Sequence, residues 1–177
     1  LALLAGPSPL GEWLANSSLA VHMLVEHGLL LGAGALAAVG LQHVLPAVRA
    51  ALVALGAWRT AGAAVFLAVL CTWHVPVLFG AAVESLPLHA VMHICYLLAG
   101  FSLVVALPAL GAFGRVLLLL GLQALMVVLA LAMYTSAITY PPYPPSQTAT
   151  AGIAMMLGMQ VLIPLIALAP RLEEALR

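Results

Sequence analysis

The chain has 177 residues, of which 66% are hydrophobic and only 6% are charged, and its mean hydropathy is +1.23. A soluble domain carries roughly 25% charged residues, so this composition excludes a water-soluble globular protein and indicates a multi-pass protein of the cell membrane. The formal net charge is zero, there is no lysine and the five arginines are scattered singly, which excludes nucleic acid as a partner and leaves the lipid bilayer as the expected surroundings.

Five apolar runs follow one another along the chain, each long enough to cross roughly 30 Å of hydrocarbon as a helix. They are predicted at about 19–45, 61–79, 88–109, 115–136 and 148–168. The stretch 50–58 is too short to span the bilayer and is expected to connect the first two helices at one membrane face. The sequence therefore predicts an all-α, polytopic membrane bundle of about five transmembrane helices, a single domain over residues 1–177.

The arginines orient this bundle, because short cytoplasmic loops are enriched in Arg and Lys. They occur only after the first, third and fifth predicted helices, at Arg49, Arg59, Arg115, Arg171 and Arg177. All five then lie on one side, which predicts that the N-terminus is outside and the C-terminus is cytoplasmic. The sequence begins with Leu1 and not with Met, which leaves open a processed signal or part of another helix upstream.

Five of the six histidines fall at one predicted depth, near the outer ends of three helices. Two begin the first helix, one lies near the end of the second, and two begin the third: His22, His27, His74, His89 and His93. The alternating direction of the helices brings these distant positions to one level, whereas His43 lies at the inner end. Ionisable residues inside a span are costly and are candidates for function, so the five histidines predict a metal site.

The spacing of the histidines sets the expected geometry of this site. His89 and His93 are four residues apart and share a helix face, with Cβ atoms about 5–6 Å apart, so their imidazoles can bind one ion. His22 and His27 are five apart, about 140° around an α-helix. Both reach one site only if it lies between their faces or if the helix is distorted there. Glu26, four residues after His22, is the one acid expected inside the bundle.

Sulfur donors near these histidines favour copper(I) over magnesium or calcium. Together with Glu26 they are secondary candidates for the site: Met23, Cys71 and Met92. Methionine and free cysteine are also common packing residues, and both cysteines are expected to be buried. A lone histidine in a span can simply hydrogen-bond a neighbouring helix, but five at one depth favour a shared site.

Two other cofactors fit part of the pattern. A haem b could be held between His27 and His93 on two helices. Alternatively, a zinc ion held by three histidines could activate water with Glu26 as the base, as in an intramembrane hydrolase. The residues alone therefore leave copper, haem b and zinc open.

Four segments resemble the CtaG-like assembly factors of cytochrome c oxidase in order and spacing, over roughly residues 20–160. They are His22-Met23 through His27, Trp73-His74-Val75-Pro76, Leu86-Pro87-Leu88-His89 with His93, and Ser146-Gln147 leading to Ala154-Met155-Met156. The resemblance implies a compact, archaeal-type member that handles copper at the outer membrane face, or a resident subunit of the oxidase. It further implies oxidase subunits or a copper chaperone as partners, leaves a homo-oligomer open, and favours a helper in oxidase assembly over an enzyme.

Overall fold

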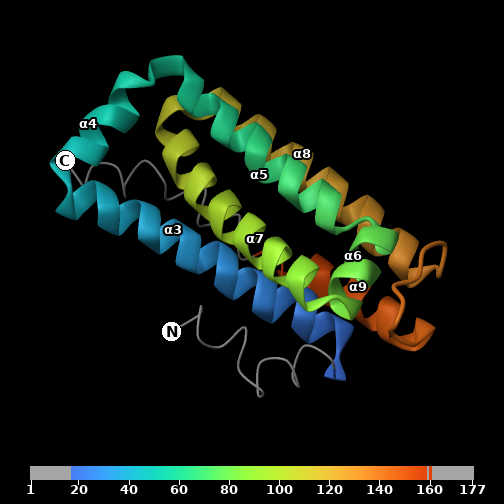
Figure 1. Ribbon diagram of the computed structural model, residues 1–177. Helices are drawn as coiled ribbons and strands as arrows, with labels where there is room; N and C mark the ends of the chain where they lie inside the picture. Colours follow the sequence, from blue (N-terminus) through green and yellow to red (C-terminus); the bar gives the residue numbers. More distant parts are fainter. Residues whose placement is uncertain (1–16, 159, 161–177) are drawn as a thin grey trace.

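The structure, a computed structural model, describes residues 17–158 and 160, without the side chains of residues 57 and 58. The regular elements in this part of the chain are helices (Figure 1), which confirms the predicted all-α class for these residues. In chain order they are η1 (Val21–Glu26), α3 (His27–Val44), α4 (Pro46–Ala54), η2 (Gly56–Thr60), α5 (Ala61–Trp73), α6 (Pro76–Glu84), α7 (Leu86–Ala106), η3 (Leu107–Ala109), α8 (Gly111–Tyr134) and α9 (Pro145–Gly158).

Three helical stretches are long and apolar enough to cross a membrane. They are η1 with α3 (Val21–Val44), α7 with η3 (Leu86–Ala109), and α8. The pair α5 and α6 passes the same test together but is bent by 76°, so it is a broken span or a re-entrant loop. The described residues thus contain three or four helices that could span a membrane. The last part of the fifth predicted helix, residues 161–168, and Arg171 and Arg177 lie outside the described residues.

The second predicted helix is interrupted. The sequence predicts one helix over residues 61–79, but α5 ends at Trp73 and α6 begins at Pro76. Proline lacks an N–H, its ring collides with the preceding turn, and it pushes the residue before it into extended backbone. Val75 has this extended conformation. The hydroxyl of Tyr140 donates a hydrogen bond of 2.6 Å to the carbonyl oxygen of His74 at the break, so a distant loop satisfies a carbonyl that the interrupted helix leaves free.

Helices α3 and α7 form a closely packed parallel pair (Figure 1). A Cβ atom at Gly34 would overlap the carbonyl oxygen of Leu97, and one at Gly100 would overlap the carbonyl oxygen of Leu31. The missing side chains let the two backbones approach each other, as in other membrane helix pairs. Because η1 continues into α3 and both helices of the pair begin at the same end of the bundle, His22 and His89 lie at one level.

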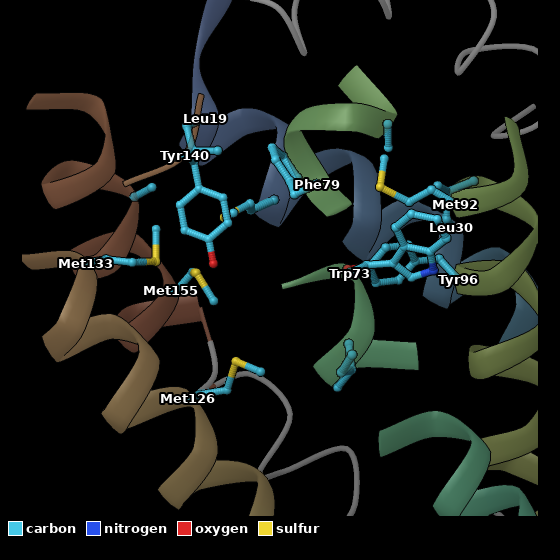
Figure 2. Close-up of a cluster of buried hydrophobic side chains, with 14 of the residues drawn as sticks. Leu19, Leu30, Trp73, Phe79, Met92, Tyr96, Met126, Met133, Tyr140 and Met155 are labelled. Atoms are coloured by element: carbon cyan, nitrogen blue, oxygen red, sulfur yellow. The ribbon is translucent and has the colours of Figure 1, made fainter. Parts of the chain in front are cut away.

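Figure 2 shows the buried hydrophobic cluster next to this end of the bundle. It joins side chains from η1, α3 and all helices from α5 to α9 except the 3-10 helix η3, with Trp73 and Phe79 on either side of the α5–α6 break, Tyr96 on α7, and Met133 and Met155 on α8 and α9. These methionines are at most 3% exposed, so they serve the core of the bundle. The cluster fixes the position of the short helix α6 beside the first turns of η1 and α7.

We expect Gly100→Ala to destabilise the protein by about 1–3 kcal/mol, because the added methyl group must separate two packed backbones. The free energy of unfolding in detergent micelles measures this change. Gly40→Ala on α3 is the matched control, since a Cβ there meets nothing within 4 Å. Equal stabilities of the two variants would contradict close backbone packing as the basis of the α3–α7 pair.

Candidate metal centre

The first of the two histidines lies in a π-helical turn and the second directly follows it. Residues Val21–Glu26 form the π-helix η1, and the N–H of His27 bonds the carbonyl oxygen of His22, five residues earlier. Such turns are rare and frequently occur at functional sites. A π turn advances less per residue around the axis than an α turn, so it brings residues five apart toward the same side. The ring centroids of His22 and His27 are consequently 5.1 Å apart, which is the distortion that the sequence spacing required.

The Glu26 carboxylate is the point on which three imidazoles converge. Its Oε1 atom lies 3.0 Å from Nε2 of His93 and 3.9 Å from Nε2 of His89. Its Oε2 atom lies 3.6 Å from Nε2 of His22. The Glu26 side chain is only 12% exposed. A largely buried acid is thus surrounded by nitrogen atoms from η1 and from the first turns of α7.

These separations suit a bound transition-metal ion. With metal–ligand bonds of roughly 2.0–2.1 Å, neighbouring ligand atoms of a tetrahedral site are about 3.3 Å apart. The nitrogen atoms lie 3.0–3.9 Å from the Glu26 oxygens, which brackets that value. The ligand atoms of His22, Glu26 and His89 all lie within 4.8 Å of one another, so small side-chain rotations would close them around one ion.

Hydrogen bonding within the protein leaves polar atoms of the cluster unpaired. Distances of 3.6 and 3.9 Å are too long for hydrogen bonds. Nε2 of His22 and Oε2 of Glu26 are both buried and have no hydrogen-bond partner. A buried unpaired polar atom costs about 1–3 kcal/mol, and more when it is charged. A cation between these two atoms would pair both at once.

Contacts between the rings hold the imidazoles in place. The ring of His22 stacks on that of His89 at 5.2 Å with an interplanar angle of 11°, and it contacts the ring of Phe79 at 4.8 Å. The ring of His89 meets that of His93 edge to face at 4.3 Å. Since each ring restricts its neighbour, the three Nε2 atoms are positioned before any ion binds.

His27 and His74 have contacts other than the Glu26 carboxylate. The ring of His27 stacks on that of Tyr96 at 3.9 Å, and both of its nitrogen atoms are buried without a hydrogen-bond partner. Nδ1 of His74 bonds the carbonyl oxygen of Leu70 at 2.7 Å, and it must carry the proton because a carbonyl only accepts. Of the five predicted histidines, the structure therefore brings three around Glu26, places His27 beside His22, and ties His74 to its own helix.

The predicted sulfur ligands have other surroundings. Met23 and Met92 are buried in the hydrophobic core, and Figure 2 shows Met92 beside Leu30 and Tyr96. Cys71 is exposed on α5, so the prediction that it is a buried thiol is wrong: it lies on a face of the helix that no other described element covers. The donor atoms at Glu26 are therefore nitrogen and oxygen.

Tyr143 is a contributor that the sequence analysis missed. Its hydroxyl lies 3.0 Å from Nδ1 of His22. Burial raises the pKa of this hydroxyl above its ordinary value, and the negative charge of Glu26 raises it further, so the phenol stays protonated at neutral pH. The available signal was a tyrosine between two Pro-Pro pairs in a predicted outer loop, at the same membrane level as the histidines.

The family comparison covers almost the whole chain. Residues 3–170 match the family described as "Protein of unknown function (DUF1404)". No curated protein and no solved structure matches the sequence. Because this match covers almost the whole chain, the chain belongs to the DUF1404 family.

Proposed function

We propose that this protein binds one transition-metal ion, copper in the first place, between Glu26 and the imidazoles of His22, His89 and His93. The observation that carries the proposal is the convergence of three Nε2 atoms on one buried carboxylate at 3.0–3.9 Å. The ligands belong to helices that pack closely against each other, and sites built on packed helices hold their ligands more rigidly than sites on loops.

The donor set narrows the choice of ion. Imidazole nitrogen suits copper, zinc, iron and nickel, whereas calcium and magnesium prefer six or more oxygen ligands. Among divalent ions of the first transition row, copper(II) binds a given site of this kind most tightly. Nitrogen and oxygen donors also favour copper(II) over the copper(I) that sulfur ligands would select. The resemblance to CtaG-like assembly factors, which rests on the same histidines, also favours copper.

We further propose that the protein holds copper at the outer membrane face for a haem-copper terminal oxidase, as an assembly factor or a resident subunit. A copper chaperone or an oxidase subunit would exchange the ion by ligand substitution, which requires no covalent chemistry in this chain. The support is the resemblance over residues 20–160 and a site whose donors can be replaced one at a time. In this role the protein is not an enzyme.

The proposed topology has five spans with the N-terminus outside and the C-terminus in the cytoplasm. Its support is the position of Arg49, Arg59 and Arg115 at the end of the bundle that lies far from the histidine site (Figure 1). Arg59 donates a hydrogen bond of 3.1 Å to the carbonyl oxygen of Val105 at this end. Since arginine-rich loops face the cytoplasm, the metal site would face outward.

A zinc hydrolase is the second candidate, because Glu26 lies 3.0–3.9 Å from the three imidazole nitrogen atoms that would hold the zinc ion. In that function the three histidines would hold zinc and Glu26 would take a proton from bound water. The two functions differ in the role of Glu26, which is a ligand in one and a base in the other. A haem b between His27 and His93 stays a prediction that an absorption spectrum tests by its Soret band.

We expect the protein, purified in detergent and loaded with Cu(II), to retain one copper per chain in elemental analysis. His93→Ala and Glu26→Gln should each weaken copper binding by at least about 10–100-fold, because even the outer-shell partners of a metal site contribute that much. His43→Ala, an exposed histidine at the other end of α3, should bind copper like the wild type. A protein that carries zinc and keeps it after Glu26→Gln would favour the hydrolase, and one that binds no metal would refute both functions.

Copper affinity should fall as the pH is lowered. Imidazole and carboxylate groups must lose their protons to bind a metal, and the ordinary pKa of histidine is about 6.5. Between about pH 8 and pH 5.5, competing protons should weaken binding, by about tenfold per pH unit for each proton displaced at the acidic end. Calorimetric titration in buffers of different ionisation enthalpy measures the protons released. A pH-independent affinity would contradict a site made of these groups.

The proposed topology predicts which loops are reached from outside the cell. In a background with Cys71→Ala and Cys95→Ala, a cysteine at Ser146 should react with a membrane-impermeant maleimide on intact cells. A cysteine at Ala112 should react only after the membrane is opened. Both positions are exposed in the structure, so equal labelling of the two on intact cells would contradict this orientation.

A further inference from the structure

A proline-rich segment covers the metal site from the side of α6. This segment, Tyr140–Gln147, makes side-chain hydrogen bonds to two other parts of the chain. Tyr140 donates to the carbonyl oxygen of His74 at the α5–α6 break. The side-chain oxygen of Gln147 accepts a bond of 3.0 Å from the backbone N–H of Leu19, just before η1. Both ends of the segment are therefore anchored.

Tyr143 occupies the middle of this anchored segment. It is 7% exposed, and its ring lies 6.3 Å from both Phe79 and His22. A Cβ atom at Gly80 would come within 2.9 Å of the carbonyl oxygen of Pro141, so the segment lies close against α6. The segment thus holds the Tyr143 hydroxyl next to His22 and has little freedom to move away.

The contact with Tyr143 bears directly on the metal-binding nitrogen of His22. An uncharged imidazole carries one proton, and the ring nitrogen that carries it cannot bind a metal. Nε2 of His22 faces Glu26, so it binds an ion only when the proton is on Nδ1. Nδ1 then donates to the Tyr143 oxygen, 3.0 Å away. A hydroxyl can accept this bond, and it can donate to Nδ1 when the proton is on Nε2.

We propose that Tyr143 is a positioning residue of the metal site, which orients the His22 ring and accepts a hydrogen bond from its Nδ1 when Nε2 binds the ion. The inference rests on the proposed function and adds a residue outside the predicted ligands. Metal-binding histidines usually donate a hydrogen bond from their second ring nitrogen to a partner of this kind. Loss of that partner lowers metal affinity by about 10–100-fold. In this account, ion binding reverses the hydrogen bond, and the Tyr143 hydroxyl changes from donor to acceptor.

The experiment compares Tyr143→Phe with Tyr140→Phe in the full chain, in detergent, titrated with Cu(II). Each variant removes one hydroxyl from the same segment, but the Tyr140 hydroxyl bonds a backbone carbonyl outside the site. We expect Tyr143→Phe to bind copper about 10–100-fold more weakly and to change the signal of the remote imidazole nitrogen in pulsed electron paramagnetic resonance. Tyr140→Phe should lower the thermal midpoint while keeping wild-type copper affinity and an unchanged nitrogen signal.

An infrared difference spectrum of the wild type supplies a second measurement, which does not depend on a variant that folds correctly. Copper binding should shift the C–O stretching band of one tyrosine as its hydroxyl turns from donor to acceptor, and Tyr140→Phe should retain that shift. The proposal is overturned if copper binds the wild type without a tyrosine band shift, or if Tyr140→Phe weakens copper binding as much as Tyr143→Phe. A wild-type protein that binds no copper refutes the proposed function itself, and the role of Tyr143 falls with it.

Discussion

The need to neutralise one largely buried carboxylate organises the end of this bundle at which η1 and α7 begin. An ionised acid taken out of water costs several kcal/mol unless a positive partner compensates for it. Glu26 is surrounded by His22, His89 and His93, and a metal ion shared between these imidazoles and the carboxylate would supply that partner.

The helix packing fixes the distances within the site. Close approach of α3 and α7 depends on Gly34 and Gly100, which lie several turns from the imidazoles. Because both helices are rigid and begin at the same end, this approach also sets the gap between η1 and the first turns of α7. A small increase in the helix separation would move His89 and His93 away from Glu26, so packing at the middle of the bundle and ligand geometry at its end are coupled.

Hydropathy and helical spacing predicted the long helices and the pairing of His89 with His93, because both follow from local periodicity. Pro76 is also a local signal for the break in the second helix, because proline interrupts a helix and extends the residue before it. The spacing of His22 and His27 predicts a distorted helix only if both side chains belong to one site. Helical periodicity of 3.6 residues does not reveal the π turn itself. The contact of Tyr143 with His22 joins residues 121 positions apart, and no local rule predicts a contact at that separation.

The same geometry determines how an ion would leave in the proposed transfer. The side chain of His22 is fully buried, and Tyr143 holds it, whereas those of His89 and His93 are 13% and 15% exposed. Ligand substitution proceeds stepwise, and an incoming donor reaches the more accessible ligands first. His89 and His93 would therefore be replaced while His22 and Glu26 still hold the ion. Transfer would begin on the α7 side, and His22 would be the last histidine to release the metal.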